Sequence, residues 1–221
     1  MTRLTQYITE DKSLISLPVD EINSLIQKDC QYYLRLIKGY EPLYRGMDKS
    51  IRFGKNNVRQ GRISKGLSPK NANSLNAFLA HYGHVRRDKA VIATSDRYHA
   101  GVFGEAYMIF PIGKFNFSWV EAKDLNLPDK GWYGGYFIER YFKDFQIRKI
   151  KEWDISRREK IEKYEYITLS KPFKDYFTTN KGFLTAYTKG YEIWLDAKSY
   201  YFVRDKQFRW SHSTGLMEHS F

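Results

Sequence analysis

Residues 90–112 read AVIATSDRYHAGVFGEAYMIFPI, and this stretch decides the fold class. The apolar run over residues 90–95 is typical of a buried strand. Residues 96–104 mix polar residues, aromatic residues and glycines, and they predict one or two helical turns. A second apolar strand follows directly over residues 105–112. Two strands separated by a very short helix indicate a mixed fold with both α and β elements.

Helices are predicted on both sides of this stretch. Apolar residues recur at three- and four-residue spacing over residues 22–37, which predicts an amphipathic helix. Cys30 falls on its apolar face, so we assign this cysteine to the core. A Ser-Pro start and a Gly stop predict a second helix over residues 69–82, and residues 128–163 have a helical tendency.

The remaining elements complete an α+β domain. A short helix is expected near residues 181–187, and further strands are expected at residues 43–47, 115–119, 191–195 and 200–203. The sequence contains no internal repeat and no evident linker. We therefore expect a single domain over residues 1–221, with an N-terminal helical region at residues 1–40 and a core at residues 41–205.

Composition excludes several classes of protein. The 221 residues are 42% hydrophobic and 17% aromatic, which is globular composition. The single cysteine excludes an intramolecular disulfide and a multi-cysteine metal site, so no metal is expected and a reduced, cytoplasmic compartment is indicated. The N-terminus does not resemble a signal peptide. No run approaches the roughly 18 apolar residues of a membrane span, so no membrane partner is expected.

Positive charge is concentrated in one segment. The net charge is +12, and residues 49–87 contain nine basic residues and no acidic residue. A loop rich in Gly and Asn is expected at the start of this segment. One interpretation is a surface that binds phosphate groups of a nucleic acid; the other is a solvated basic loop that favours solubility. Under the first interpretation, the expected nucleic-acid-binding residues are Arg52, Lys55, Arg59, Arg62, Lys65, Arg86 and Arg87.

Three polar sites stand out on separate predicted strands. Arg45 lies in Leu-Tyr-Arg-Gly, Thr94 and Ser95 end an apolar strand, and Glu192 lies in Tyr-Glu-Ile-Trp-Leu. Each has an ordinary structural interpretation. Arg45 could pair with a nearby carboxylate, Asp48 or Glu41. The Thr-Ser pair could simply cap the next helix, and Glu192 could lie on the solvent face of its strand.

The order of these three sites resembles the mono-ADP-ribosyltransferases of the arginine–serine–glutamate type. In that family an arginine lies on the first core strand, a Ser-Thr-Ser run ends a later strand, and a catalytic glutamate begins a strand near the end of the domain. The resemblance covers roughly residues 40–205. It implies an α+β fold with a split β-sheet core and flanking helices.

The resemblance also implies roles for the residues. Glu192 would stabilise positive charge on the ribose of NAD, and Arg45 would orient the dinucleotide. Thr94 or Ser95 would hold the glutamate and the ribose in register, and Tyr98 or Phe103 would stack on nicotinamide. The catalytic set is thus Glu192, Arg45, Ser95 and Thr94, and the NAD-binding set is Arg45, Thr94, Ser95, Tyr98 and Phe103.

Two positions depart from the family pattern. Alanine (Ala93) replaces the first serine of Ser-Thr-Ser. Gly190 stands two residues before the glutamate, where arginine-modifying members have glutamate, which argues against an arginine side chain as the acceptor.

The expected function is therefore an NAD-dependent mono-ADP-ribosyltransferase. The basic segment favours a single-stranded nucleic acid as the acceptor, with RNA ahead of DNA. Two alternatives are an ADP-ribosyltransferase acting on a protein, and an inactive nucleic-acid-binding protein on the same fold. The family suggests a toxin or phage effector, for which an antitoxin protein would be a further partner.

Overall fold

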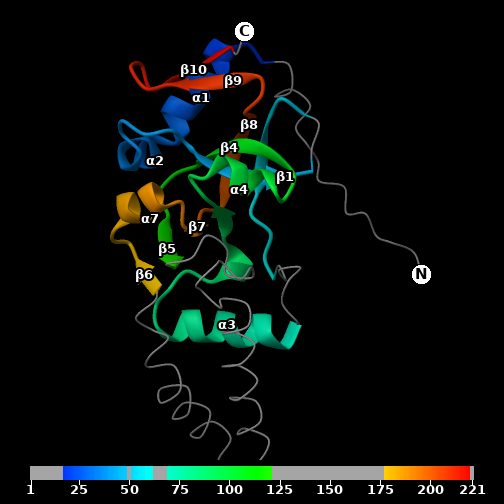
Figure 1. Ribbon diagram of the computed structural model, residues 1–221, viewed down its shortest axis with the longest axis vertical. Coiled ribbons are helices and arrows are strands. Elements are labelled where there is room, and N and C mark those ends of the chain that lie inside the picture. Colours follow the sequence, from blue (N-terminus) through cyan, green and yellow to red (C-terminus); the bar gives the residue numbers. More distant parts are fainter. Residues whose placement is uncertain (1–16, 49–50, 62–68, 121–176, 220–221) are drawn as a thin grey trace, which may run out of the picture.

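The computed structural model describes residues 17–48, 51–61, 69–120 and 177–219. The helical tendency expected for residues 128–163 lies outside these ranges. Helices and antiparallel strands are both present along the chain (Figure 1), and the α+β class is confirmed. The helices are α1 (Val19–Asp29), α2 (Gln31–Leu36), α3 (Pro69–His81), α4 (Arg97–Gly101) and α7 (Phe183–Lys189), with a 3-10 turn, η2, at Arg87–Lys89.

Within the described residues the strands form two separate four-stranded antiparallel sheets and a hairpin. The first sheet has the order β1-β4-β8-β2 and the second has the order β3-β7-β5-β6, with β9 and β10 as the hairpin. The strands of the first sheet are β1 (Leu43–Met47), β2 (Phe53–Asn57), β4 (Glu105–Pro111) and β8 (Ser199–Arg204). Those of the second are β3 (Val91–Ala93), β5 (Asn116–Val120), β6 (Phe177–Thr179) and β7 (Ile193–Asp196), and the hairpin is β9 (Phe208–Ser211) and β10 (Leu216–His219).

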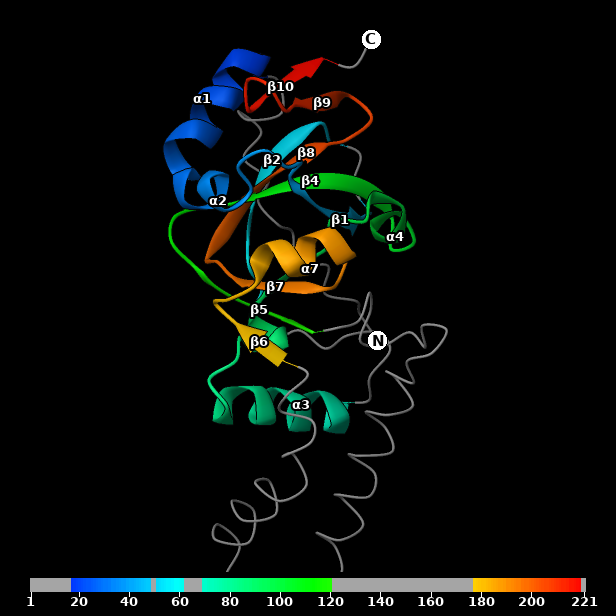
Figure 2. The same cartoon turned by 60° about the vertical axis from the view of Figure 1, so that its left-hand side comes forward.

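The elements are stacked along the long axis of the molecule (Figures 1 and 2). The β9–β10 hairpin and α1 lie at one end, the first sheet follows, and the second sheet lies between it and α3 at the other end. One hydrophobic cluster joins the N-terminal helices to both sheets, and it includes Ile26, Phe110, Phe202 and Leu195. Because this cluster contains side chains from both sheets, the two sheets share a core.

The helix predicted over residues 22–37 is divided at Cys30. The carbonyl of Asp29 accepts a hydrogen bond from the Gly113 amide (2.8 Å), and its carboxylate accepts one from the Tyr201 hydroxyl (2.7 Å). These tertiary contacts compete with a continuous helix at this turn. Cys30 itself is fully buried, which confirms its assignment to the core.

The expectation of a loop at the start of the basic segment is wrong for residues 53–57, because β2 pairs there with β8. Phe53 and Asn56 are buried, whereas Lys55 and Asn57 are exposed. Buried and exposed residues alternate from Gly54 to Asn57, but the glycine and asparagines conceal the pattern.

Gly46 allows α4 to lie against β1. A Cβ atom at this position would come within 2.2 Å of the Ala100 carbonyl oxygen and 2.8 Å of the Phe103 Cβ. Any larger residue would push α4 away from the strand. The glycine that follows Arg45 thus brings the short helix after Ser95 next to the arginine.

Candidate functional site

The two sheets meet at a pair of residues from β1 and the end of β3. Tyr44 and Thr94 form an isolated antiparallel bridge, with the Tyr44 amide 2.6 Å from the Thr94 carbonyl and the Thr94 amide 3.0 Å from the Tyr44 carbonyl. On the other side of β3, Ala93 pairs with Ile193 of β7. Continuing this antiparallel register by one residue places Thr94 opposite Glu192. The three predicted sites therefore lie on neighbouring segments. We call the place where the Tyr44–Thr94 bridge connects the two sheets the joint.

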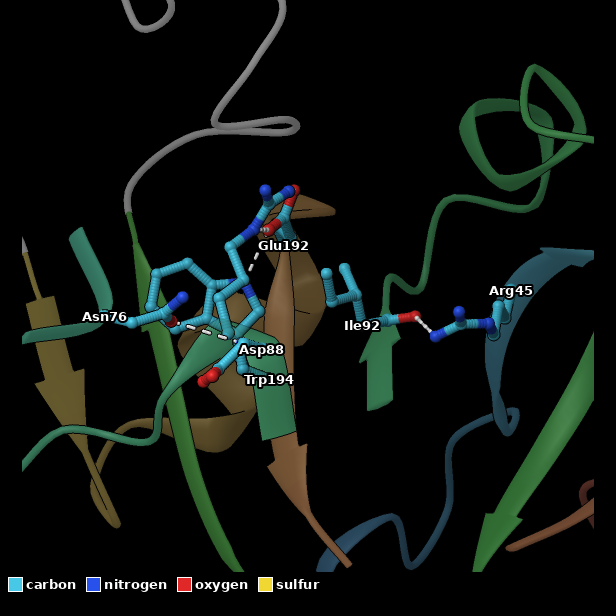
Figure 3. A network of polar contacts seen from close by, with 7 residues as sticks. Arg45, Asn76, Asp88, Ile92, Glu192 and Trp194 are labelled. Carbon is cyan, nitrogen blue, oxygen red and sulfur yellow. Dashed lines mark hydrogen bonds and ion pairs between the residues drawn. The ribbon is translucent and has the colours of Figure 1, made fainter. Parts of the chain in front are cut away.

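Arg45 braces this joint from the first sheet. Its Nη1 donates a hydrogen bond to the carbonyl oxygen of Ile92 on β3, at 3.1 Å, and the side chain is half-buried. Figure 3 shows the guanidinium pointing toward the Ile92 carbonyl, with Glu192 on the far side of Ile92. Within the described part of the chain Arg45 forms no ion pair, so the pairing with Glu41 or Asp48 that the sequence left open is not found there.

The Thr94 and Ser95 hydroxyls form hydrogen bonds with backbone groups near α7 and α4. Thr94 donates to the Gly190 carbonyl (3.0 Å) and accepts from the Asp96 amide (3.0 Å), and Ser95 donates to the Tyr187 carbonyl. The expectation that one of these hydroxyls holds Glu192 is therefore replaced by a structural role. They fix the end of β3 against the end of α7, just before Glu192.

Gly190 has a conformational reason to be glycine. It ends α7 with a φ of 67°, in the left-handed region that favours glycine, and a Cβ there would lie 3.3 Å from the Cβ of Asp96. Asp96 in turn caps α4, because its side chain accepts a hydrogen bond from the His99 amide (3.0 Å). A glutamate at residue 190 would strain this turn.

Glu192 lies directly before β7 and is 4% exposed, so the solvent-face interpretation is wrong. Its Oε1 accepts a hydrogen bond from Nε of Arg87 at 2.8 Å, and its Oε2 accepts one from Nη2 of the same residue at 3.1 Å. The indole N–H of Trp194, which is fully buried, also donates to Oε1. Figure 3 shows Glu192 close to Trp194 of β7, with Asp88 and Asn76 nearby.

Arg87 was expected to contact nucleic acid, and the structure corrects that expectation. Its side chain is only 6% exposed and forms a bidentate ion pair with Glu192. A buried, paired guanidinium cannot bind a phosphate on the surface. The sequence does not distinguish Arg87 from the exposed cations around it, because its partner Glu192 lies 105 residues further along the chain.

The other basic residues differ in how exposed they are. Arg86 is bound through two hydrogen bonds to Asp88, at 3.0 and 2.6 Å. The Arg52 guanidinium lies 4.7 Å from the centre of the Phe208 ring, and its Nη2 lies 3.4 Å from the Leu17 carbonyl oxygen. Lys55 and Arg59 are exposed. Arg62 and Lys65 lie outside the described residues.

The two aromatic candidates for nicotinamide lie on and just after α4. Tyr98 is 90% exposed and Phe103 is 53% exposed, and the Phe103 ring makes an edge contact with His99 at 5.5 Å. They are among the most exposed large apolar side chains that the structure describes. Phe103 lies next to Gly46, the residue that follows Arg45.

The described residues show neither a metal centre nor a membrane span. No group of three or more His, Cys, Asp or Glu side chains in that part of the chain could hold a metal ion. No helix there is both long and apolar enough to cross a membrane. Comparisons with protein families, with curated proteins and with solved structures find no significant match for this chain.

Proposed function

We propose that the protein is an NAD-dependent mono-ADP-ribosyltransferase built on a split-sheet fold of that family's type. The observation that carries the proposal is the joint between the sheets. Arg45 of β1, the Thr94–Ser95 end of β3 and Glu192 at the start of β7 are brought together there from three distant parts of the sequence. This is the order and the strand context of the arginine–serine–glutamate family.

The chemistry of these groups suits cleavage of NAD. In the proposed reaction the bond between ribose C1′ and the nicotinamide nitrogen breaks, and its electron pair leaves with nicotinamide. Positive charge then develops on the ribose, as in glycoside hydrolysis. A fixed carboxylate at Glu192 that accepts a hydrogen bond from the 2′-hydroxyl would stabilise that charge more than it stabilises NAD. The acceptor attacks C1′ and loses a proton.

Arg45 has the donors required for the dinucleotide. One of its N–H groups bonds to Ile92, and the guanidinium carries five such donors in a planar fork. The remaining donors could bind a phosphate oxygen of NAD while the first keeps the two sheets in place. Tyr98 or Phe103 would stack on nicotinamide from the α4 side.

The proposed acceptor is a single-stranded nucleic acid, with RNA favoured over DNA, in the cytoplasm. The support for this acceptor is charge. The chain carries a net charge of +12, and Lys55 and Arg59 are exposed on and just after β2. An exposed cationic strand attracts phosphates regardless of base sequence.

The test is to incubate the purified protein with NAD labelled in the adenylate phosphate and with total cell extract. Label that nuclease removes, and protease does not, supports a nucleic-acid acceptor. Label that only protease removes would show that the acceptor is a protein, and the proposed transferase activity would still stand. Absence of label and of nicotinamide release would contradict the proposed enzyme. The Glu192→Gln variant is the matched control for background labelling.

A further inference from the structure

Arg87 and Glu192 form the most buried ion pair that the structure describes. Their side chains are 6% and 5% exposed, and the two hydrogen bonds of 2.8 and 3.1 Å run in parallel between the planar groups. Trp194 donates a third hydrogen bond to the same carboxylate. Bidentate pairing of this kind fixes orientation as well as charge, which a single contact to a lysine would not do.

The backbone that carries Arg87 is anchored on both sides. Before it, the Val85 amide donates to Ser118 Oγ on β5 (2.9 Å). After it, the Asp88 amide donates to the Asn76 side-chain oxygen on α3 (3.2 Å), a contact visible in Figure 3. The turn is therefore fixed between the second sheet and α3 before any ligand binds. A guanidinium presented from such a turn is preorganised for its partner.

Burial gives the pair a chemical consequence. A carboxylate withdrawn from water favours its protonated form, whereas a cation in direct contact favours the ionised form. The other charged groups at this turn are Arg86 and Asp88, which pair with each other, and Lys89, which is exposed. Arg87 is the cation that the structure places in direct contact with Glu192, and its charge favours the ionised carboxylate.

We propose that Arg87 is a positioning residue that sets the orientation of the Glu192 carboxylate and keeps it ionised for ADP-ribosyl transfer. The inference rests on the function proposed above. It differs from the ordinary structural interpretation, in which the pair only holds η2 against β7. The two interpretations differ in their effect on the pH dependence of the reaction.

Arg87→Gln removes the cation and leaves a shorter polar side chain. The carboxylate would then remain buried beside Trp194 and would lose the positive charge that Arg87 supplies. An adjacent cation lowers the pKa of a carboxyl group by about 1–3 units, so we expect the acid limb of the rate profile to move upward by at least about one pH unit. The rate should fall most at the acid end of the pH range and should recover in part at higher pH.

Two further variants separate charge from shape. Arg87→Lys retains the charge, so its acid limb should stay close to that of the wild type while the rate falls, because a point charge cannot align the carboxylate through two bonds. Arg209→Gln removes one positive charge from an exposed ion pair with Glu218 on the β9–β10 hairpin, where the arginine side chain is 64% exposed. It is the matched control and should leave the profile unchanged.

The experiment measures nicotinamide release from NAD by water between pH 5 and 9 for the wild type and these three variants. An upward shift confined to Arg87→Gln supports the proposal. An unchanged Arg87→Gln profile, or a fall equal at every pH, would overturn it. If Arg87→Gln does not fold, the test rests on Arg87→Lys. A folded Arg87→Lys variant with a rate at least about tenfold below the wild type supports the positioning role. A wild-type rate in this variant contradicts it.

A second measurement keeps this inference separate from the proposed function. The side-chain carboxyl carbon of Glu192 can be followed by NMR in protein labelled at glutamate and assigned by its loss in Glu192→Gln. Titration of this carbon at higher pH in Arg87→Gln than in the wild type supports the ionisation role, whether or not the protein cleaves NAD. Identical titration in both proteins would contradict that role.

Discussion

Tyr44 and Thr94 exchange two backbone hydrogen bonds, of 2.6 and 3.0 Å, although they lie on strands of different sheets. This single bridge brings Arg45 next to β3 and sets the end of β3 beside the start of β7. Both the arginine and the glutamate of the proposed site are thereby placed by backbone pairing. Substitutions at this joint should therefore affect the fold as well as the proposed chemistry.

Replacing Arg45 by lysine separates the two tasks of this residue. A lysine ammonium can still donate one hydrogen bond to the Ile92 carbonyl, but it cannot present a planar fork to a phosphate. We expect Arg45→Lys to lose NAD cleavage nearly as completely as Arg45→Ala, yet to unfold at a temperature closer to that of the wild type. Thermal unfolding and kcat/KM for NAD check this. Recovery of most of the activity in Arg45→Lys would show that only generic charge is required.

Much of the fold follows from local patterns in the sequence. The apolar runs of β4 and β8 and the spacing of α1 are strong because each element buries a continuous face. β2 is not predicted because its buried positions include a glycine and an asparagine, and two of its five residues are asparagine. The division of the first helix was missed because its cause is a contact from Asp29 to Gly113, far along the chain.

The candidate site was predictable only in part. Arg45, Thr94 and Glu192 were recognised by their order along the chain, but their contacts depend on long-range pairing. No local pattern connects Arg87 with Glu192. Two features of the sequence point weakly to this buried pair. Arg87 lies shortly before a predicted buried strand, and Trp194 follows the glutamate by two residues, on the same face of the chain. A buried carboxylate needs such partners, but the sequence does not say which cation supplies the charge.

The exposed cations next to β2 should bind nucleic acid without contributing to NAD cleavage. Lys55→Gln combined with Arg59→Gln removes two charges, and Lys181→Gln combined with Lys189→Gln removes two exposed charges near α7 as the matched control. The slope of log affinity against log salt should fall by about 0.7 for each phosphate of a single strand that the variant no longer neutralises. Filter binding to a single-stranded RNA over a salt series measures it. Equal reductions of the slope in both double variants would contradict a nucleic-acid-binding surface at β2.

Cys30 should be inert in the native protein. Burial raises the pKa of its thiol, and the thiol donates a hydrogen bond to the Phe110 carbonyl (sulfur to oxygen, 3.5 Å). Because the thiolate is the reactive form, a thiol-reactive reagent at pH 8 should modify native protein at least about a hundredfold more slowly than protein unfolded in denaturant. Rapid modification under native conditions would contradict the assignment of Cys30 to the core.

Stability should decline at alkaline pH because several buried tyrosines must keep their protons. Burial raises the pKa of Tyr187 to about 12, and it also raises the pKa values of Tyr33, Tyr44 and Tyr201. Since an unfolded tyrosine titrates near about pH 10, the stability due to these groups is complete below that pH and is lost as the pH rises toward their folded values.

Tyr44→Phe tests one of these contributions. Its hydroxyl donates to the Glu41 carboxylate (2.8 Å), so the variant should lose some stability at pH 7. It should also show a shallower fall in the free energy of unfolding between pH 9.5 and 11. Tyr98→Phe, in which the hydroxyl removed is on a residue that is 90% exposed, is the control and should follow the wild type. A wild-type slope in Tyr44→Phe would contradict the assignment.

Glu192→Gln should change the stability of the protein as well as its activity. The amide keeps the shape of the side chain but removes the negative charge that the buried Arg87 guanidinium contacts. Removing one partner of a buried pair costs about 3–5 kcal/mol, so we expect a clear loss of stability. The double variant Arg87→Gln with Glu192→Gln should regain part of it, because no buried charge remains in the pair. Urea unfolding of the single and the double variant measures both free energies of unfolding. A double variant less stable than Glu192→Gln would contradict this expectation.

The most direct test of the central claim is the rate of nicotinamide release from NAD, measured without any acceptor for the wild type and Glu192→Gln. The wild type should release nicotinamide, and the rate should fall at least about a hundredfold in the variant under conditions where circular dichroism shows both proteins folded. A wild-type protein that leaves NAD intact, or a Glu192→Gln variant that cleaves it at the wild-type rate, would contradict the account.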